Sequence, residues 1–394
     1  MKRRIEIAVF AAIAIAAICW IAWSLYHSHM IEGFRRDLVG KGFPEDYAGR
    51  LAELQFGHRD WIFEPIEISD LAWDKIVEKE LTPSWNLVPA GKSYASYCAK
   101  NAKAYDSGAW YQASREAIAY FMDPRNWLNE REIFMFETLQ FDERSQTLEA
   151  VEKTLSKTFM AGRKCGGATG TFAELLMDVG RRLKVSPVFL AGRMASEQGL
   201  GAPQSLGTIG DCLVGLSTNR SDKVGDADIW GKRFARGGEA TKKVLAKGAA
   251  AYNGYYNFFN FRAYGIGVFE IKYNAWVEAT ADETREKYLG PWDTQAKAIE
   301  GGSMKIKERY IDTYRHTLYF QKFSVLPAAK DFRWKQYMQN IAAPLVEARN
   351  TAKAYSAADT LDAPYRFLIP VYKQMPKVPA PDPANGKSIY SPSR

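Results

Sequence analysis

The sequence contains very few of the side chains that bind transition metals. Only four histidines and four cysteines occur among 394 residues, and Cys98, Cys165 and Cys212 are scattered without the spacing of a zinc site. We therefore expect no metal ion, and we also expect no organic cofactor. The fourth cysteine, Cys19, lies in an apolar N-terminal run. The other three allow at most one disulfide, and their number leaves the pairing and the redox compartment open.

The sequence also lacks internal repeats and any nucleic-acid-binding motif. The formal net charge is +8, but the Lys and Arg residues are spread along the chain. This distribution argues against a nucleic-acid partner, because such interfaces gather basic residues on one face. A basic surface also suits an anionic polymer, although a modest charge is often only a solubility feature. Aromatic residues make up 13% of the chain, which fits either a large core or a carbohydrate groove.

One long hydrophobic run is present, at the N-terminus. Residues 7–25 are almost entirely apolar and follow basic residues at 2–4, a pattern that predicts a membrane-spanning helix with its N-terminus inside. A cleaved signal peptide is the alternative, but Trp20 and Trp23 stand where a small-x-small cleavage site would be. We expect residues 1–28 to anchor the protein once in the cytoplasmic (inner) membrane. The remainder is then periplasmic or extracellular, and because few residues separate the apolar run from Phe43 we expect the folded part to act close to the membrane.

After the anchor, the pattern predicts a mainly α (α+β) fold in two parts. Alternating residues at 61–66 predict a strand, and helical periodicity predicts helices at 71–81, 116–122, 130–139, 148–159, 172–183, 186–198, 267–278, 292–302 and 303–314. The glycines at 166, 167 and 170 mark a flexible joint. We therefore expect an N-terminal subdomain at 43–165 and a catalytic domain at 170–375. Residues 376–394 are rich in Pro and Ser, which predicts an extended or disordered tail.

The helix that Ser186 and Pro187 begin carries the most suggestive carboxylate. Glu197 follows Leu190 by seven residues and Met194 by three, so it lies on the apolar side of the helix at its C-terminal end. A carboxyl in apolar surroundings has a raised pKa, which is what a general acid in glycoside hydrolysis requires. The pattern alone fits an exposed glutamate near a helix end at least as well.

A second segment, at 252–264, reads YNGYYNFFNFRAY. Successive residues of a strand point to opposite faces, so these aromatic side chains cannot all be buried on one side. Exposed aromatic rings beside asparagine suit a sugar-binding groove, whereas a core segment with a few exposed tyrosine hydroxyls is the equally good alternative. The candidate substrate-binding residues are Tyr255, Tyr256, Asn257, Phe258, Asn260 and Tyr264.

Together, these two segments resemble the bacterial glucosaminidase domain of glycoside hydrolase family 73. The matching motifs are RMASEQG at 193–199 and YNGYYNFFNFRAYG at 252–265. Segments at 43–66, 120–139, 291–312, 317–323 and 336–341 resemble the longer glucosaminidases of clostridia and related bacteria. The resemblance covers roughly residues 43–375, and several motifs occur in the same order.

This resemblance implies a lysozyme-like, mostly helical catalytic domain that cleaves the β-1,4 bond after N-acetylglucosamine in peptidoglycan. It implies that Glu197 is the catalytic glutamate and that the 255–258 segment lines the cleft. Two departures stand out. The 210–251 segment is longer and more charged than in the family, and its role is open. Asn260-Phe261-Arg262-Ala263 replaces the usual Asn-Ile-Gly-Ala and brings a cation near the groove.

The expected mechanism is protonation of the glycosidic oxygen by Glu197. A second carboxylate could come from Asp222, Asp226 or Asp228, or the acetamido oxygen of the substrate could attack with help from Tyr255 or Tyr256. The alternatives to a glucosaminidase are a muramidase or a lytic transglycosylase on the same fold, or an inactive wall-binding scaffold. Peptidoglycan and the membrane are the expected partners, and the sequence leaves protein partners open.

Overall fold

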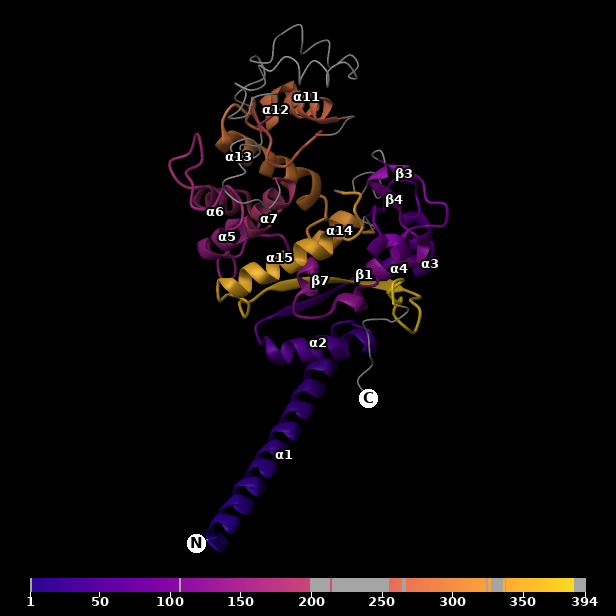
Figure 1. The fold of residues 1–394 in the computed structure, drawn as a ribbon, viewed down its shortest axis with the longest axis vertical. Coiled ribbons are helices and arrows are strands. Elements are labelled where there is room, and N and C mark those ends of the chain that lie inside the picture. The colour runs from indigo at the N-terminus through magenta and orange to yellow at the C-terminus, as the bar shows by residue number, and fades with distance from the viewer. Residues whose placement is uncertain are drawn as a thin grey trace.

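The computed structural model describes residues 2–105, 108–198, 213–214, 255–263, 267–323, 325–326, 336 and 338–385. Helices dominate these residues, and three small sheets accompany them. The prediction of a mainly α fold with some β structure is therefore confirmed. In Figure 1 one long helix projects from a body of shorter helices that are grouped around a central pair of strands.

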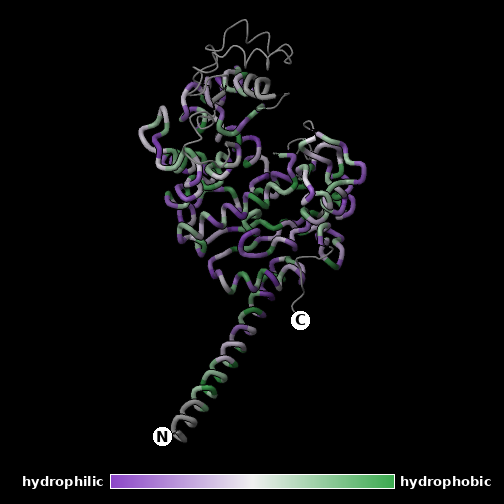
Figure 2. Tube along the Cα trace, viewed as in Figure 1, coloured by the Kyte–Doolittle hydropathy of each residue, from purple (hydrophilic) through white to green (hydrophobic). Residues whose placement is uncertain are grey.

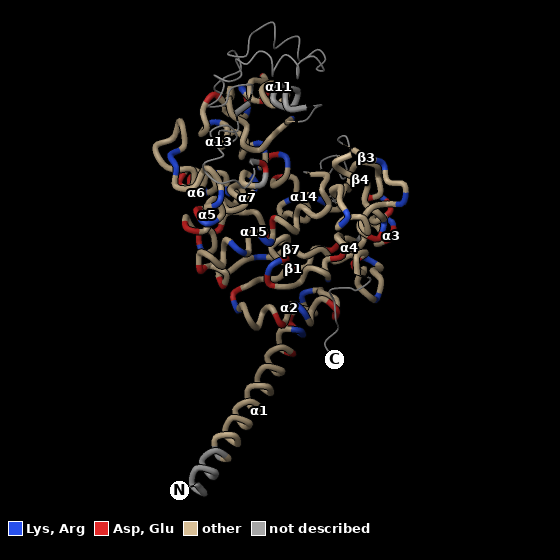
Figure 3. The backbone as a smooth tube through the Cα atoms, in the orientation of Figure 1, with Lys and Arg blue, Asp and Glu red and all other residues tan. Residues whose placement is uncertain are grey.

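The projecting helix is α1 (Lys2–Gly40). Its section from residue 12 onward is long and apolar enough to cross a membrane, and the most apolar window of that section is entirely unburied. Figure 2 shows this apolar section, and Figure 3 shows that Lys, Arg, Asp and Glu are concentrated instead on the body. The structure thus contains the apolar N-terminal helix that the sequence predicts, as a candidate signal anchor or span. The helix extends past residue 28 without a break.

The C-terminal part of α1 packs against α2 (Glu45–Gly57). The His27 ring lies 4.5 Å from the Phe56 ring, and Arg35 forms an ion pair with Glu45. Leu38 is almost fully buried and belongs to the main core. Residues 27–40 are therefore part of the folded body and do not form a linker.

Two strands from opposite ends of the chain pair at the centre of the body. β1 (Ile62–Ala72) runs parallel to β7 (Arg366–Lys373), and the Phe63 and Phe367 rings are 5.6 Å apart. The strand predicted at 61–66 is thus confirmed, although it is longer than expected. Helix α15 (Ala343–Ala357) lies beside this pair (Figure 1).

The remaining elements of the N-terminal part follow β1 along the chain. They are α3 (Trp73–Glu80), β2 (Leu87–Pro89), η1 (Lys92–Tyr97), β3 (Ala104–Tyr105), β4 (Trp110–Gln112), α4 (Arg115–Met122), η3 (Pro124–Trp127), η4 (Glu132–Phe136) and α5 (Leu148–Leu155). Strands β2, β4 and β3 form an antiparallel sheet. Asn129 accepts hydrogen bonds from two following backbone amides, as a helix cap should, but the helix expected at 130–139 is the shorter 3-10 helix η4.

The second group of elements carries the candidate site. It comprises α6 (Phe172–Leu183), α7 (Pro187–Gln198), β5 (Leu213–Val214), β6 (Tyr255–Tyr256), α11 (Gly267–Thr280), α12 (Asp282–Lys287), α13 (Gln295–Ile306), η7 (Lys307–Ile311) and α14 (Leu318–Lys322). The helices predicted at 172–183, 186–198 and 267–278 are confirmed. The helix expected at 292–302 begins at residue 295, and the stretch from 307 to 311 is a π-helix.

One connected hydrophobic core includes residues from both sides of the predicted joint at 165–170. The first part of the expected tail also belongs to the body. Arg125 donates a hydrogen bond to the Pro376 carbonyl at 2.9 Å, and Asn126 donates one to the Ala380 carbonyl at 2.8 Å. The composition of this tail predicts an extended or disordered segment, and these contacts hold its residues 376–380 against Arg125 and Asn126. Residues 386–394 lie outside the described residues.

Candidate active site

Helix α7 presents Glu197 at its C-terminal end. Ser186 caps the start of this helix, because its Oγ accepts a hydrogen bond from the Phe189 amide at 3.1 Å. Leu190 and Met194 are fully buried, and Glu197 is half-buried. The apolar face predicted for this helix is therefore correct, and it places the glutamate at the edge of the core.

A tight turn follows β6 and approaches the end of α7. The Asn257 side chain holds this turn closed: its Nδ2 donates to the Phe261 carbonyl at 2.8 Å, and its Oδ1 accepts from the Phe261 amide at 3.0 Å. Asn260 and Arg262 have positive φ angles of 51° and 56°. Asparagine tolerates this left-handed conformation better than most residues, which makes it suitable at the first of these positions.

The turn makes a direct contact with Glu197. The Asn260 Nδ2 group donates a hydrogen bond to Glu197 Oε2 at 3.1 Å and another to the Glu197 carbonyl oxygen at 2.9 Å. One amide thus binds both the carboxylate and the backbone at the end of α7. The sequence predicted that Asn260 would contact substrate, whereas in the structure its amide contacts the candidate catalytic group.

A buried ion pair lies beneath Glu197. Arg193, one helical turn earlier on α7, is within 3.0 Å of Glu347 on α15, and it donates a hydrogen bond to Gln321 on α14 at 2.8 Å. Burial raises the pKa of Glu347, the positive charge of Arg193 opposes this rise, and the negative charge of Glu197 adds to it. Three helices therefore meet at one cation directly below the candidate acid.

Tyr310 on η7 belongs to the same electrostatic neighbourhood. Burial raises the pKa of its phenol; the cations Arg193, Arg309 and Arg315 lower this pKa, and the charge of Glu197 raises it. The phenol is therefore neutral at ordinary pH. It provides a polar group near Glu197 that adds no charge.

The far side of the turn is held by a second buried ion pair. Lys305 on α13 is completely buried and binds Glu278 on α11, and its ammonium group lies 4.9 Å from the centre of the Tyr288 ring. Arg262 is 4.0 Å from Glu278, and about half of its side chain is exposed. Glu278 is thus bound by cations, whereas the Arg262 guanidinium remains accessible beside the turn that contacts Glu197.

The structure separates the predicted substrate-binding residues into two groups. Tyr255 and Tyr256 form β6 and are partly exposed. Asn257 and Phe258 are buried, and Phe258 packs against the Phe159 and Phe172 rings, so in this structure both side chains hold the turn and the core together.

Other predicted residues lie outside the described part of the chain. These are Tyr264, Asp222, Asp226 and Asp228, as well as almost all of the 210–251 segment. Sequence reasoning missed Arg193, Gln321 and Glu347. A signal for Arg193 was present, since an arginine stood on the same helical face as Leu190 and Met194.

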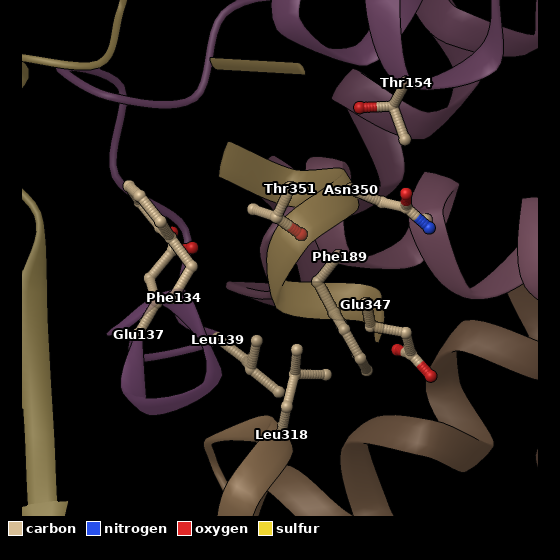
Figure 4. A pocket seen from close by; sticks show the side chains of 10 residues that line it. Phe134, Glu137, Leu139, Thr154, Phe189, Leu318, Glu347, Asn350 and Thr351 are labelled. Atoms are coloured by element: carbon tan, nitrogen blue, oxygen red, sulfur yellow. The ribbon is translucent and has the colours of Figure 1, made fainter. Parts of the chain in front are cut away.

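Behind Glu347 lies a small cavity of about 20 Å³, large enough for about one water molecule. Figure 4 shows its lining, which includes Glu137 and Phe189 together with Glu347. Burial raises the pKa of Glu137 to about 8, although the Tyr355 hydroxyl donates a hydrogen bond to its carboxylate at 2.8 Å. The cavity is too small for a sugar ring and forms part of the support of the site.

No family model and no curated protein matches this chain. Among solved structures, glucosaminidase B of S. aureus is similar, with 18% sequence identity, a TM-score of 0.43, and coverage of 79% of this chain and 93% of that one. The Major Bifunctional Autolysin has 15% identity and a TM-score of 0.43, with coverage of 79% of this chain and 99% of that one.

A third similar structure is S. aureus Autolysin E, as a catalytic mutant in complex with the disaccharide NAG-NAM. It has 14% identity and a TM-score of 0.40, with coverage of 78% of this chain and 98% of that one.

Proposed function

We propose that this protein is a peptidoglycan hydrolase, an endo-β-N-acetylglucosaminidase that cleaves the GlcNAc-β-1,4-MurNAc bond with Glu197 as general acid. The observation that carries this proposal is the placement of Glu197. It is half-buried at the end of a core helix, and the turn of the tyrosine-rich segment binds it through Asn260. The two sequence motifs that resemble family 73 are far apart in the chain, yet they meet at this carboxylate.

In the proposed reaction, Glu197 transfers its proton to the oxygen that joins the two sugars. The bond between this oxygen and the anomeric carbon breaks, and the departing sugar retains the proton as a hydroxyl group. The positive charge that develops on the anomeric carbon needs a partner, which is a nucleophilic or negatively charged group that stabilises it. Water finally adds to this carbon, and Glu197 takes up the proton that the water releases.

Two sources for that partner remain open. One is a carboxylate from Asp222, Asp226 or Asp228. The other is the acetamido oxygen of the substrate itself, oriented by the hydroxyl of Tyr255 or Tyr256. The partly exposed position of both tyrosines in β6 supports the second route. Glu278 is an unsuitable base, because it is buried and bound to Lys305.

We further propose that residues 1–28 anchor the enzyme in the cytoplasmic membrane, with residues 43–165 as supporting subdomain and 170–375 as catalytic domain outside it. The exposed apolar surface of α1 supports the anchor, since Phe10, Ile18 and Trp20 are each more than three-fifths exposed. The position of Glu197 at the edge of the core supports placing catalysis in the second part.

Digestion of purified peptidoglycan tests the proposal. The full-length protein in detergent should release fragments with GlcNAc at the reducing end, and Glu197→Gln should abolish this release while the protein remains folded. Reducing-end MurNAc would indicate a muramidase, and anhydro-MurNAc a lytic transglycosylase. Equal activity of both proteins would refute the role of Glu197, and inactivity of both would indicate a wall-binding scaffold.

A further inference from the structure

The Asn260 amide bridges two atoms of the same residue. Its Nδ2 group lies 3.1 Å from Glu197 Oε2 and 2.9 Å from the Glu197 carbonyl oxygen. An NH₂ group has two hydrogens, so one can point at each oxygen. The pair of bonds fixes the carboxylate relative to the backbone at the end of α7, where the helix no longer supplies amide partners.

This contact distinguishes the two carboxylate oxygens. A protonated carboxyl has one hydroxyl oxygen and one carbonyl-type oxygen, and an amide hydrogen is best accepted by the carbonyl-type oxygen. Because Asn260 donates to Oε2, the proton of the neutral acid belongs on Oε1. The same donation also stabilises the ionised form that remains after the proton has left.

The turn is built to present this amide. Asn260 has a φ angle of 51°, and the two Asn257 bonds to Phe261 fix the backbone on either side of it. Only glycine, asparagine and aspartate enter this conformation readily. Among these three residues, only asparagine brings a hydrogen-bond donor to Glu197.

The other titratable groups near Glu197 come from several elements. Arg193 precedes it on α7, Glu347 faces it from α15, and Tyr310 and Arg309 approach from η7. On the far side of the turn stands Arg262, beside Glu278. The described contact with Oε2 itself is the hydrogen bond that Asn260 donates.

We propose that Asn260 is a positioning residue that directs the acidic proton of Glu197 to Oε1, so that this oxygen faces the glycosidic bond. The proposal rests on the general-acid role of Glu197. It assigns Asn260 an effect on the pH dependence of the reaction as well as on its rate, because a donor to a carboxylate favours the ionised state.

Two substitutions keep the backbone and change the side chain. Asn260→Gly removes the amide at a φ angle that glycine adopts freely. Asn260→Asp keeps the shape but replaces the donor with a second carboxyl group, so that two carboxyls compete for one proton. Asn101, an exposed asparagine in the N-terminal subdomain with a φ angle of 55°, provides the matched control Asn101→Gly.

The measurement is kcat/KM against pH for full-length protein in detergent on soluble glycan fragments. The alkaline limb of this profile is the pH range in which activity falls as Glu197 loses its proton. Asn260→Gly should move this limb upward by about one pH unit, because losing a hydrogen bond to the charged carboxylate raises its pKa by roughly that amount. Its rate below this limb should fall on the order of tenfold as the carboxyl loses its orientation. Asn260→Asp should move the limb further, and Asn101→Gly should leave it unchanged.

An alkaline limb that stays in place in both folded Asn260 variants would overturn the proposal. If Asn260→Gly fails to fold, Asn260→Asp still gives the decisive pH profile, since aspartate accepts the same backbone conformation. Full activity of Glu197→Gln would instead refute the general-acid role of Glu197, and inactivity of the unchanged protein would refute the hydrolase function, so these failures are distinguishable from a failure of the proposal for Asn260.

Discussion

Replacing Arg193 with methionine should cost much of the stability of the fold. The arginine is 1% exposed, its Glu347 partner is 9% exposed, and their closest atoms are 3.0 Å apart. Methionine fills much of the same volume but leaves the carboxylate of Glu347 buried without its cation. Breaking a buried pair in this way costs about 3–5 kcal/mol. The lost hydrogen bond to Gln321 adds about 1 kcal/mol.

The stability that Arg193→Met loses should also depend on pH. Burial raises the pKa of Glu347 above its ordinary value, and removing Arg193 raises it further. Below about pH 4.5 the carboxyl is protonated in both the folded and the unfolded chain, so the missing cation costs least there. As the pH rises, the unfolded chain releases this proton before the folded chain does, and the variant becomes progressively less stable.

Urea unfolding at pH 5 and pH 8 measures both effects. The double variant Arg193→Met with Glu347→Leu removes the buried charge entirely and should recover most of the lost stability, because apolar replacements of buried ion pairs are often neutral or better. If the double variant were as unstable as Arg193→Met alone at both pH values, the unpaired carboxylate would not be the cause.

Three more outcomes are expected. Glu137→Gln should stabilise the protein above pH 8. The folded-state pKa of Glu137 is raised to about 8, so the wild type loses stability as the pH rises from about 4.5 to 8. If the variant and the wild type had the same unfolding midpoint at pH 9, this reasoning would be wrong. Arg262→Ala should raise KM for glycan whose stem peptides carry free carboxylates and leave kcat nearly unchanged, because the half-exposed guanidinium provides a positive charge at the turn. If the unchanged protein had equal KM values for glycan with free and with amidated carboxylates, Arg262 would not have this role. A chain that starts at residue 28 should keep the urea unfolding midpoint of the full protein. A chain that starts at residue 42 should lose about 2 kcal/mol or more of its free energy of unfolding, because Leu38 is then missing from the core. Similar midpoints for the two chains would show that this part of α1 adds no stability.

Local patterns predicted the elements that build the site. Ser186 before Pro187 marked the start of α7, and the spacing of Leu190, Met194 and Glu197 gave its buried face. These signals lie within a few residues of one another, so the physics of a single helix is sufficient to interpret them. The capping box of α6, in which Thr171 and Glu174 bind each other's backbone amides, is equally local.

Contacts between distant segments could not be predicted in this way. β1 finds its partner in β7, roughly three hundred residues later, and no local pattern encodes that register. The contact of Asn260 with Glu197 was not predicted for a related reason. Its sequence neighbours are aromatic, which suggested a sugar contact, but its side chain binds a residue 63 positions away. Helix α15, which supplies Glu347, was not predicted at all.

The structure also adds detail to the connection between the expected anchor and the site. Few residues separate the apolar run from Phe43, and from this we expected a site close to the membrane. In the structure, residues 27–40 continue α1 as a helix and pack on α2 through Leu38, so they add about 20 Å of rigid length and no flexible linker. Helices α7, α11 and α13 lie on the side of the body away from α1, with α2 and the β1–β7 pair between them (Figure 1). With α1 in the membrane, as proposed, the body would therefore separate Glu197 from the lipid surface, and the helical packing would determine that distance.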